Sequence, residues 1–312
     1  MEMLIPGTLF VPGATIACGL MITISLLLSV IKQRRLRLWG YQWMASLIKA
    51  SFLKIITFLC GAKVAGWSER SMSLTRQSGQ ATQARHVAII MDGNRRYGRE
   101  KYQDALKGHW DGGQTLVDTV RWCMEEGVQF LTVYAFSTEN WKRDSAEIDL
   151  LMTIFVKYAE RCEKEALENN IRIRVFCTER QRLPRSVIGA IDKMERNTRD
   201  KTGFSLNLCV SYGSRGDMAL ACQRVSERVV KGELRVEDIN EQVIAQNLVT
   251  HGIPDPDILI RTSGERRLSN YLLFELAYTE LFFLDKYWPQ VTKSDLLNIL
   301  NEYDARHRRY GA

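Results

Sequence analysis

The chain has 312 residues, of which 25% are charged and 46% are hydrophobic, and these proportions exclude a mostly disordered protein. The formal net charge is +7, but residues 1–85 hold ten Lys/Arg against two Glu, while the remainder holds 33 basic and 34 acidic side chains. The basic excess therefore belongs to the N-terminal segment, and a nucleic-acid-binding surface on the main body of the chain is disfavoured.

The first 37 residues are typical of a membrane anchor with a basic flank. No charged residue lies between Met3 and Ile31, and Ala14–Ile31 would be about 27 Å long as a helix, enough to cross a bilayer core. The basic run Lys32–Arg37 follows directly, which predicts that the rest of the chain stays on the cytosolic side. The alternative is a buried helix of a soluble domain. We expect a transmembrane anchor over residues 1–37.

Residues 38–65 form a second apolar stretch, with Ile48, Phe52 and Ile55 on one stripe of a predicted helix. An amphipathic helix lying on a membrane and a helix packed on the globular body of the chain fit this pattern equally well. Residues 66–85 are polar and rich in Ser, Gln and Thr, which is typical of a linker. The globular domain is therefore expected over residues 86–312.

From His86 onward, predicted strands alternate with predicted helices. Apolar runs typical of buried strands occupy His86–Met91, Phe130–Phe136, Ile171–Cys177, Phe204–Tyr212, Ile258–Arg261 and Leu281–Leu284. Helical patterns occupy residues 112–126, 146–169, 184–199, 215–231, 237–249 and 293–309. This alternation predicts one α/β domain with a mostly parallel central sheet and helices on both faces.

Polar residues follow the first predicted strand, in the run Asp92-Gly93-Asn94-Arg95-Arg96. Ligands of open α/β sheets bind beyond the carboxyl ends of the strands. Glycine lets the backbone approach a ligand closely, and the arginine fork matches phosphate oxygens. The single carboxylate suits a divalent metal that bridges it to a diphosphate. The alternative is a turn that ends the strand, with solvated arginines.

Two more predicted strand ends carry polar donors. Ser137, Asn140 and Arg143 follow the second strand, and a further group after Ile258–Ile260 consists of Arg261, Arg267 and Ser269. The chain contains no P-loop, no GxGxxG, no HExxH and no Gly-x-Ser-x-Gly motif. The pattern therefore predicts two anionic substrates, one Mg²⁺ and no covalent nucleophile.

Four segments resemble the motifs of cis-prenyltransferases, namely His86–Tyr97, Tyr134–Trp141, Ile260–Glu265 and Arg267–Asn270. They occur in the order and spacing of that family, and the resemblance runs from His86 to Gly311. The resemblance implies Mg²⁺-dependent, repeated condensation of isopentenyl diphosphate onto an allylic diphosphate such as farnesyl diphosphate, in Z geometry. The growing product would lie in an apolar cavity between the helices predicted at 112–126 and 146–169.

The resemblance also implies a role for each matched residue. Asp92 would be the essential carboxylate that works with Mg²⁺, and Glu280 a second metal-associated carboxylate. Asn140 and Arg143 would be catalytic, with Asn140 handling the proton that is lost. The residues expected to bind substrate are Gly93, Asn94, Arg95, Arg96, His109, Ser137, Trp141, Arg261, Arg267, Ser269, Arg309 and Gly311. One departure is Ala105, where many members carry an arginine.

Arg309-Tyr310-Gly311 resembles the Arg-x-Gly motif by which one subunit completes its partner's isopentenyl diphosphate site. Because the chain also carries Asp92, we expect a self-sufficient homodimer formed through the catalytic domain. An accessory, non-catalytic subunit of the same family is the alternative, and the retained polar strand ends argue against it. The resemblance further implies synthesis of dolichol for protein glycosylation at the endoplasmic reticulum membrane, with the catalytic domain facing the cytosol.

Overall fold

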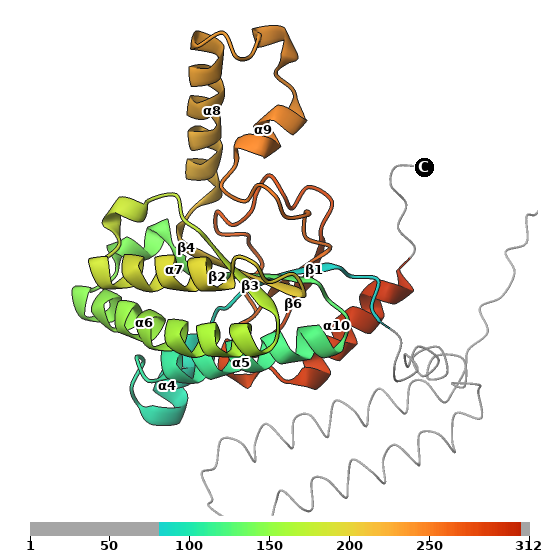
Figure 1. Cartoon of the computed structure of the whole chain (residues 1–312). Coiled ribbons are helices and arrows are strands. Elements are labelled where there is room, and N and C mark those ends of the chain that lie inside the picture. Colours follow the sequence, from blue (N-terminus) through green and yellow to red (C-terminus); the bar gives the residue numbers. More distant parts are fainter. Residues whose placement is uncertain (1–80, 307–312) are drawn as a thin grey trace, which may run out of the picture. The chain divides into compact units, whose positions relative to one another are not determined.

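The structure is a computed structural model that describes residues 81–306 (Figure 1). The expected anchor at residues 1–37, the stretch 38–65, and both Arg309 and Gly311 lie outside the described residues. Within residues 81–306, no helix is both long enough and apolar enough to cross a membrane.

Six strands form one sheet in the order β3-β4-β2-β1-β5-β6, and every neighbouring pair is parallel. The strands are β1 (His86–Ile90), β2 (Phe130–Ser137), β3 (Ile171–Phe176), β4 (Phe204–Tyr212), β5 (Ile258–Arg261) and β6 (Glu280–Phe283). Strands β1, β4 and β5 are buried along their whole length, which explains their continuous apolar sequence. The predicted parallel sheet is confirmed for the described part of the chain.

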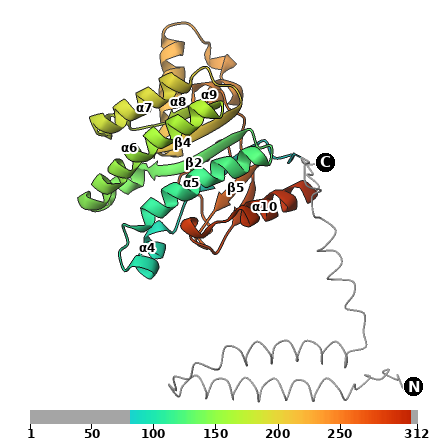
Figure 2. The same ribbon diagram turned by 60° about the horizontal axis from the view of Figure 1, so that its bottom comes forward.

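Helices lie on both sides of the sheet, as predicted. The helices are α4 (Asn94–Tyr102), α5 (Gly108–Glu125), α6 (Ser145–Glu168), α7 (Arg185–Thr198), α8 (Ser214–Val230), α9 (Glu241–Asn247) and α10 (Lys293–Ala305). Single 3₁₀ turns are η1 (Thr138–Lys142), η2 (Arg180–Arg182), η3 (Val236–Asp238) and η4 (Trp288–Gln290). Helices α5, α6, α7 and α10 cover one face (Figure 2), whereas α8 and α9 project from the opposite side (Figure 1).

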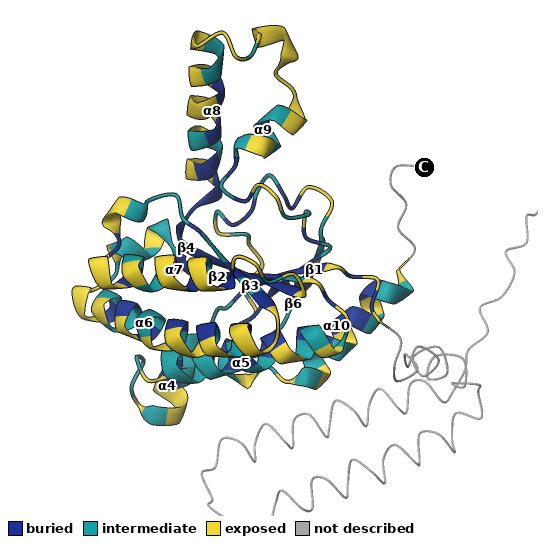
Figure 3. Cartoon of the chain, in the orientation of Figure 1, coloured by how far each residue is buried: buried dark blue, intermediate teal, exposed yellow. Residues whose placement is uncertain are grey.

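Two apolar clusters hold these layers together, one on each face of the sheet. Leu131 and Val133 of β2 belong to the cluster under the helices, together with residues of α5, α6, α7 and α10. Tyr134 points to the other face, where it stacks on Tyr271 with 4.5 Å between ring centroids. This alternation follows from the two-residue period of a strand. The buried residues concentrate in the strands and on the inner sides of the helices (Figure 3).

The last residues of the expected linker pack on the globular body. Thr82 Oγ1 donates a hydrogen bond of 2.9 Å to Asp304 Oδ1, and the Arg85 amide donates one of 2.7 Å to Asp257 Oδ2. Ala84 is fully buried. The packed body therefore includes residues just before His86, and the chain enters it at the amino ends of the strands.

Candidate functional site

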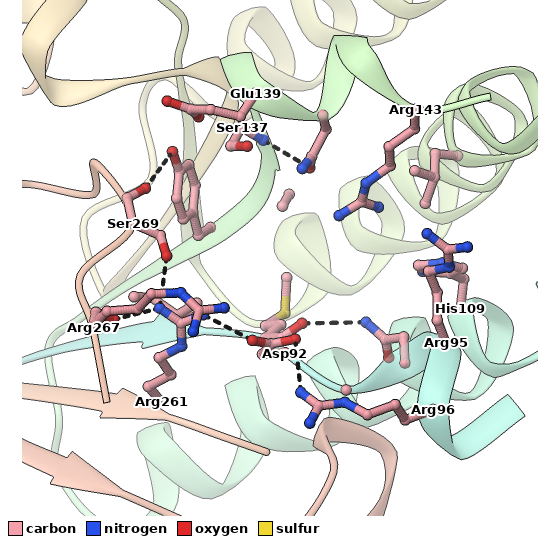
Figure 4. Close-up of a pocket in the computed structure, with 18 of the residues that line it drawn as sticks. Asp92, Arg95, Arg96, His109, Ser137, Glu139, Arg143, Arg261, Arg267 and Ser269 are labelled. Carbon is pink, nitrogen blue, oxygen red and sulfur yellow. Dashed lines mark hydrogen bonds and ion pairs between the residues drawn. The ribbon is translucent and has the colours of Figure 1, made fainter. Parts of the chain in front are cut away.

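A polar cavity of about 730 Å³ opens at the carboxyl ends of β1, β2 and β5 (Figure 4). Most residues that the sequence assigned to substrate or metal binding line it together. These are Asp92, Gly93, Asn94, Arg95, Arg96, His109, Ser137, Asn140, Arg143, Arg261, Arg267 and Ser269. The parallel sheet brings them together because every strand ends at the same edge.

Asp92 lies in the middle of this cavity, where two arginines face its carboxylate (Figure 4). Arg261 Nη2 donates to Oδ2 at 2.8 Å, and Arg96 Nη2 lies 3.7 Å from Oδ1. Arg261 is only 3% exposed and also donates to Ser269 Oγ at 2.8 Å and to the carbonyl oxygen of Arg267. Arg261 therefore ties Asp92 to the segment that carries the other anion-binding groups, while the Asp92 side chain stays 28% exposed to the cavity.

The turn after β1 requires glycine. Gly93 has φ of +101°, and a Cβ there would lie 2.8 Å from the Tyr287 ring and 2.9 Å from Ser263 Oγ. Thr262 Oγ1 holds the preceding residue in place, because it accepts from the Asp92 amide at 2.9 Å and donates to the Asp92 carbonyl at 2.7 Å. The turn directs Asp92 into the cavity and starts helix α4 beside it.

The first turn of α4 presents backbone N–H groups at the cavity. The first amides of an α-helix have no intrahelical acceptor, and no side chain caps the start of α4. Asn94, Arg95 and Arg96 occupy these positions and all line the cavity. A helix N-terminus with arginine side chains around it is suited to bind a phosphate or diphosphate.

A buried carboxylate that the sequence analysis missed lies beside these groups. Glu147, in the first turn of α6, is 4% exposed and accepts from Arg143 Nη1 at 2.9 Å. Its Oε2 lies 3.1 Å from Arg95 Nη1, and its Oε1 lies 3.7 Å from His109 Nε2. The only sequence signal is an acidic residue four positions after Arg143, a spacing that usually indicates a solvated surface pair.

His109 is neutral in this environment. Burial, together with the positive charges of Arg143 and Arg95, lowers the pKa of His109 to about 4. The positive charge at this end of the cavity therefore comes from the two arginines, and the imidazole contributes a polar but uncharged wall.

Three charged or amide side chains of the cavity were also not identified from sequence: Arg99, Glu139 and Asn270. Asn270 Nδ2 donates to Glu139 Oε1 at 2.9 Å, which joins the end of β2 to the segment after β5. Glu139 lies within the Ser137–Trp141 segment, so its position in the run was its only signal. Arg99 is one turn beyond Arg95 on α4 and follows the same helical face.

An apolar cavity of about 120 Å³ adjoins the polar one and lies between α5 and α6. This position confirms the prediction of an apolar cavity between these helices. The residues that line both cavities are Met91, Asn94, His109, Ala135 and Leu151. Beyond that junction the walls are mainly apolar: Leu116, Phe136, Met152, Ile154, Phe155, Tyr158, Ala159, Cys162, Leu208, Val210 and Trp288.

Trp141 is not among the residues that line the polar cavity, so the structure does not place it with the other predicted substrate-binding residues. Its ring packs against Phe136 with 4.8 Å between centroids, and its Nε1 donates to Ser211 Oγ at 2.8 Å. The tryptophan directly follows cavity residues in sequence, but its 3₁₀ turn directs the side chain toward the core.

Glu280 is also placed away from the site. It is the first residue of β6 and pairs in register with Ile258, the first residue of β5, while Asp92 follows the last residue of β1. Glu280 forms an ion pair with Arg306. Within one chain the structure therefore does not bring Glu280 to Asp92, because the first and last residues of parallel strands lie at opposite ends of the strands.

The remaining residues still suit Mg²⁺. This ion is commonly held by one or two carboxylates together with substrate phosphates, and Asp92 offers one partly exposed carboxylate in a cavity rich in arginine. Among residues 81–306, no three His, Cys, Asp or Glu side chains form a metal cluster by themselves. The donor set therefore fits an ion whose coordination is completed by a diphosphate.

Residues 90–311 match the family model described as "Putative undecaprenyl diphosphate synthase". The chain is 44% identical over 229 residues to the tritrans,polycis-undecaprenyl-diphosphate synthase (geranylgeranyl-diphosphate specific) of Pyrococcus furiosus, across 73% of this chain and 86% of that protein. The isoprenyl transferase of Bacillus thuringiensis subsp. konkukian is 39% identical over 226 residues, across 72% of this chain and 87% of that protein. The crystal structure of lavandulyl diphosphate synthase from Lavandula x intermedia, in complex with dimethylallyl diphosphate, superposes with a TM-score of 0.71 at 33% identity, across 73% of this chain and 98% of that chain.

Proposed function

The chain belongs to the undecaprenyl diphosphate synthase-like family of prenyltransferases, and from this premise we propose that it catalyses Mg²⁺-dependent cis-prenyl chain elongation. Isopentenyl diphosphate would be condensed repeatedly onto an allylic diphosphate, with farnesyl diphosphate as the first primer. The observation that carries this proposal is the junction of a cationic cavity with an apolar one. An allylic diphosphate has an anionic end and an apolar end, and the two cavities match this division.

The allylic diphosphate would bind at the start of α4, on the free N–H groups and on Arg95 and Arg96. Asn94 and His109 line both cavities, so the prenyl chain would pass between them toward Phe155 and the other apolar residues. Isopentenyl diphosphate would occupy the opposite side, on Arg267 and Ser269, which Arg261 holds in place. Ser137 and Asn140 also line the polar cavity and would contact the condensing carbons, while Arg143, which shares the Glu147 carboxylate with Arg95, would face the departing diphosphate.

The chemistry needs no covalent nucleophile from the protein. The bond between C1 of the allylic substrate and its diphosphate oxygen breaks, C1 bonds to C4 of isopentenyl diphosphate, and C2 loses a proton to the departing diphosphate as the C2=C3 double bond forms. Negative charge then builds on the departing diphosphate, and fixed arginines and backbone N–H groups stabilise it without reorganisation. Asp92 would hold Mg²⁺, which supplies further charge neutralisation to the diphosphate.

The test is incorporation of labelled isopentenyl diphosphate by the purified full chain with Mg²⁺ and farnesyl diphosphate. Geranylgeranyl and dimethylallyl diphosphates serve as alternative primers, since one relative is named as geranylgeranyl-diphosphate specific. We expect polyprenyl diphosphate that disappears in Asp92→Ala and persists in Asp149→Ala, a control at an exposed position of α6. A well-folded wild-type chain that makes no product with any primer would refute the proposal.

We further propose that the active form is a homodimer in which Arg309 of one subunit completes the other's site. Asp92→Ala and Arg309→Ala would each be inactive alone. Mixing them would restore part of the activity, since every heterodimer contains one intact site, made by Asp92 of the Arg309→Ala subunit and Arg309 of the Asp92→Ala subunit. No recovery from a mixture that exchanges subunits would contradict this arrangement.

The proposed product supplies dolichol for protein glycosylation, and the proposed location is the endoplasmic reticulum membrane with the catalytic domain in the cytosol. The charge-free run up to Ile31 and the basic run Lys32–Arg37 support this part. Fractionation of cells expressing the full chain, with and without residues 1–37, tests it. The full chain should sediment with endoplasmic reticulum membranes and be protease-accessible from the cytosolic side.

A further inference from the structure

Glu147 binds two arginines of the polar cavity from a position that does not itself line the cavity. Each carboxylate oxygen binds a different guanidinium, Oε1 the Arg143 Nη1 at 2.9 Å and Oε2 the Arg95 Nη1 at 3.1 Å. Arg95 comes from α4 and Arg143 from the end of η1, so Glu147 joins two elements that flank the cavity. Both arginines line the cavity, and Glu147 itself does not.

The burial of this group differs from that of its partners. Glu147 is 4% exposed, whereas Arg95 and Arg143 are 41% and 31% exposed. The Glu147 carboxylate is therefore fixed in the protein interior. The Arg95 and Arg143 guanidinium groups keep surface that faces the cavity (Figure 4). A guanidinium has more N–H donors than the one that Glu147 accepts from each, so both arginines retain donors for diphosphate oxygens.

A buried ion pair is an inefficient way to gain stability, because desolvation offsets much of the attraction between the charges. Its use here is better explained by geometry, since planar guanidinium groups held by a fixed carboxylate keep one orientation. The carboxylate also offsets one of the two positive charges, and the adjacent His109 adds none because its pKa is lowered.

We infer that Glu147 is a positioning residue that holds Arg95 and Arg143 in the orientation required by the departing allylic diphosphate. This inference rests on the proposed function. Arg95 and Arg143 already have this orientation before the diphosphate leaves. They therefore stabilise the negative charge that develops on the diphosphate in the transition state. The same carboxylate weakens binding of a diphosphate in the ground state, because it lowers the net positive charge around the anion.

The test is Glu147→Gln in the full chain, a change that keeps the size of the side chain and removes its charge. A glutamine amide has one acceptor oxygen, so its NH₂ group would face one of the two arginines and release it. We expect kcat to fall on the order of 100-fold, because a misplaced catalytic group costs about that much. The KM for the allylic diphosphate should not rise, and inorganic diphosphate should bind severalfold more tightly in calorimetry.

The matched control is Glu163→Gln on the same helix. Glu163 is also buried and ion-paired, with Lys193 at 3.1 Å, and it lies outside both cavities. We expect Glu163→Gln to lower the melting temperature. Any loss of activity should be no larger than the loss of folded protein. Glu147→Gln with unchanged kcat, with a raised KM alone, or with a loss no larger than that of Glu163→Gln would overturn the inference.

Failure of the inference can be told apart from failure of the proposed function. A wild-type chain that makes no polyprenyl product refutes the function, while binding of inorganic diphosphate still tests the role of Glu147 without turnover. Weaker or unchanged binding in Glu147→Gln would overturn the positioning role in either case.

Discussion

The polar cavity and the apolar cavity share a boundary but are built from different parts of the fold. The polar cavity collects residues that follow β1, β2 and β5, and ion pairs and hydrogen bonds hold them, as between Arg261 and Asp92. The apolar cavity lies between α5 and α6 and is also walled by residues of β2 and β4, and mainly apolar packing sets its width. Recognition of the diphosphate therefore depends on a few fixed side chains, whereas the space for the prenyl chain depends on the distance between two helices.

The gap between the helices depends on small residues of α5. A Cβ at Gly113 would lie 2.4 Å from Cε2 of Tyr158, so only glycine allows that ring its present place. Tyr158 is also fixed at its hydroxyl, which donates to the Trp110 carbonyl at 2.8 Å. Tyr158 is therefore a fixed part of the α6 wall of the apolar cavity, next to Phe155 and the other α6 residues that line it.

Removing the charge of Arg261 should have the largest effect on activity, because this arginine holds other residues of the polar cavity in place. In Arg261→Gln, Asp92 and Ser269 lose their shared donor, and we expect kcat/KM for isopentenyl diphosphate to fall roughly 100- to 1,000-fold. Arg224→Gln is the control, because that arginine is exposed on α8 and binds only a backbone carbonyl in the described structure. An activity within tenfold of wild type would show that Arg261 does not organise the site.

Adding a methyl group at Gly112, next to Asn94 where the two cavities meet, should disturb the packing of both cavities. A Cβ at Gly112 would lie 2.2 Å from Asn94 Oδ1 and 3.0 Å from Trp288 Cδ1. We expect Gly112→Ala to destabilise the fold by about 1–3 kcal/mol in urea unfolding, because the neighbours must move. Gly189→Ala on α7 meets no atom within 4 Å and should stabilise the fold by about 0.5–1 kcal/mol. Equal effects of the two changes would contradict the tight packing at Gly112.

Lowering the pH should reduce the stability of the folded chain through His109, which lines both cavities. The unfolded chain protonates this imidazole below the ordinary pKa of 6.5, while the folded chain does so only near pH 4, so acid favours unfolding. Between pH 7 and pH 5 this group should cost about 2 kcal/mol of stability. His109→Asn should remove that part of the pH dependence in chemical denaturation, and His251→Asn, at an exposed position, should not. Identical pH profiles for His109→Asn and wild type would contradict the neutral state of His109.

Changes in the apolar cavity should keep kcat within tenfold of the wild-type value and should alter the chain length of the product. Tyr158→Ala widens the gap and should shift the products toward longer chains, while Gly113→Ala narrows it and should shift them toward shorter ones. Tyr158→Phe keeps the ring, loses the bond to Trp110 and should lie between wild type and Tyr158→Ala. Mass spectrometry of the products measures the shift. An unchanged distribution in all three would show that this cavity does not limit the product.

Most of the candidate site could be predicted because its residues directly follow strands that are visible as apolar runs. Asp92 and Arg261 are examples, since parallel strands bring their ends to one edge. Trp141 was misplaced because neighbouring residues of a 3₁₀ turn point in different directions. Glu280 was grouped with Asp92 on the family resemblance alone, although the strand predicted at Leu281–Leu284 already put it at the amino end of a strand, opposite to Asp92.

The sequence by itself determined the α/β class, the order of the elements and the polar strand ends, because these follow from local periodicity and from side chains next to a strand. Only the tertiary structure decided that Glu147 binds Arg95 and Arg143, and that Tyr158 closes the gap beside Gly113. These contacts join helices that are far apart in the chain, and a helix has the same local pattern whichever partner its side chains meet. Partner choice depends on how the helices pack on the sheet, which no single segment encodes.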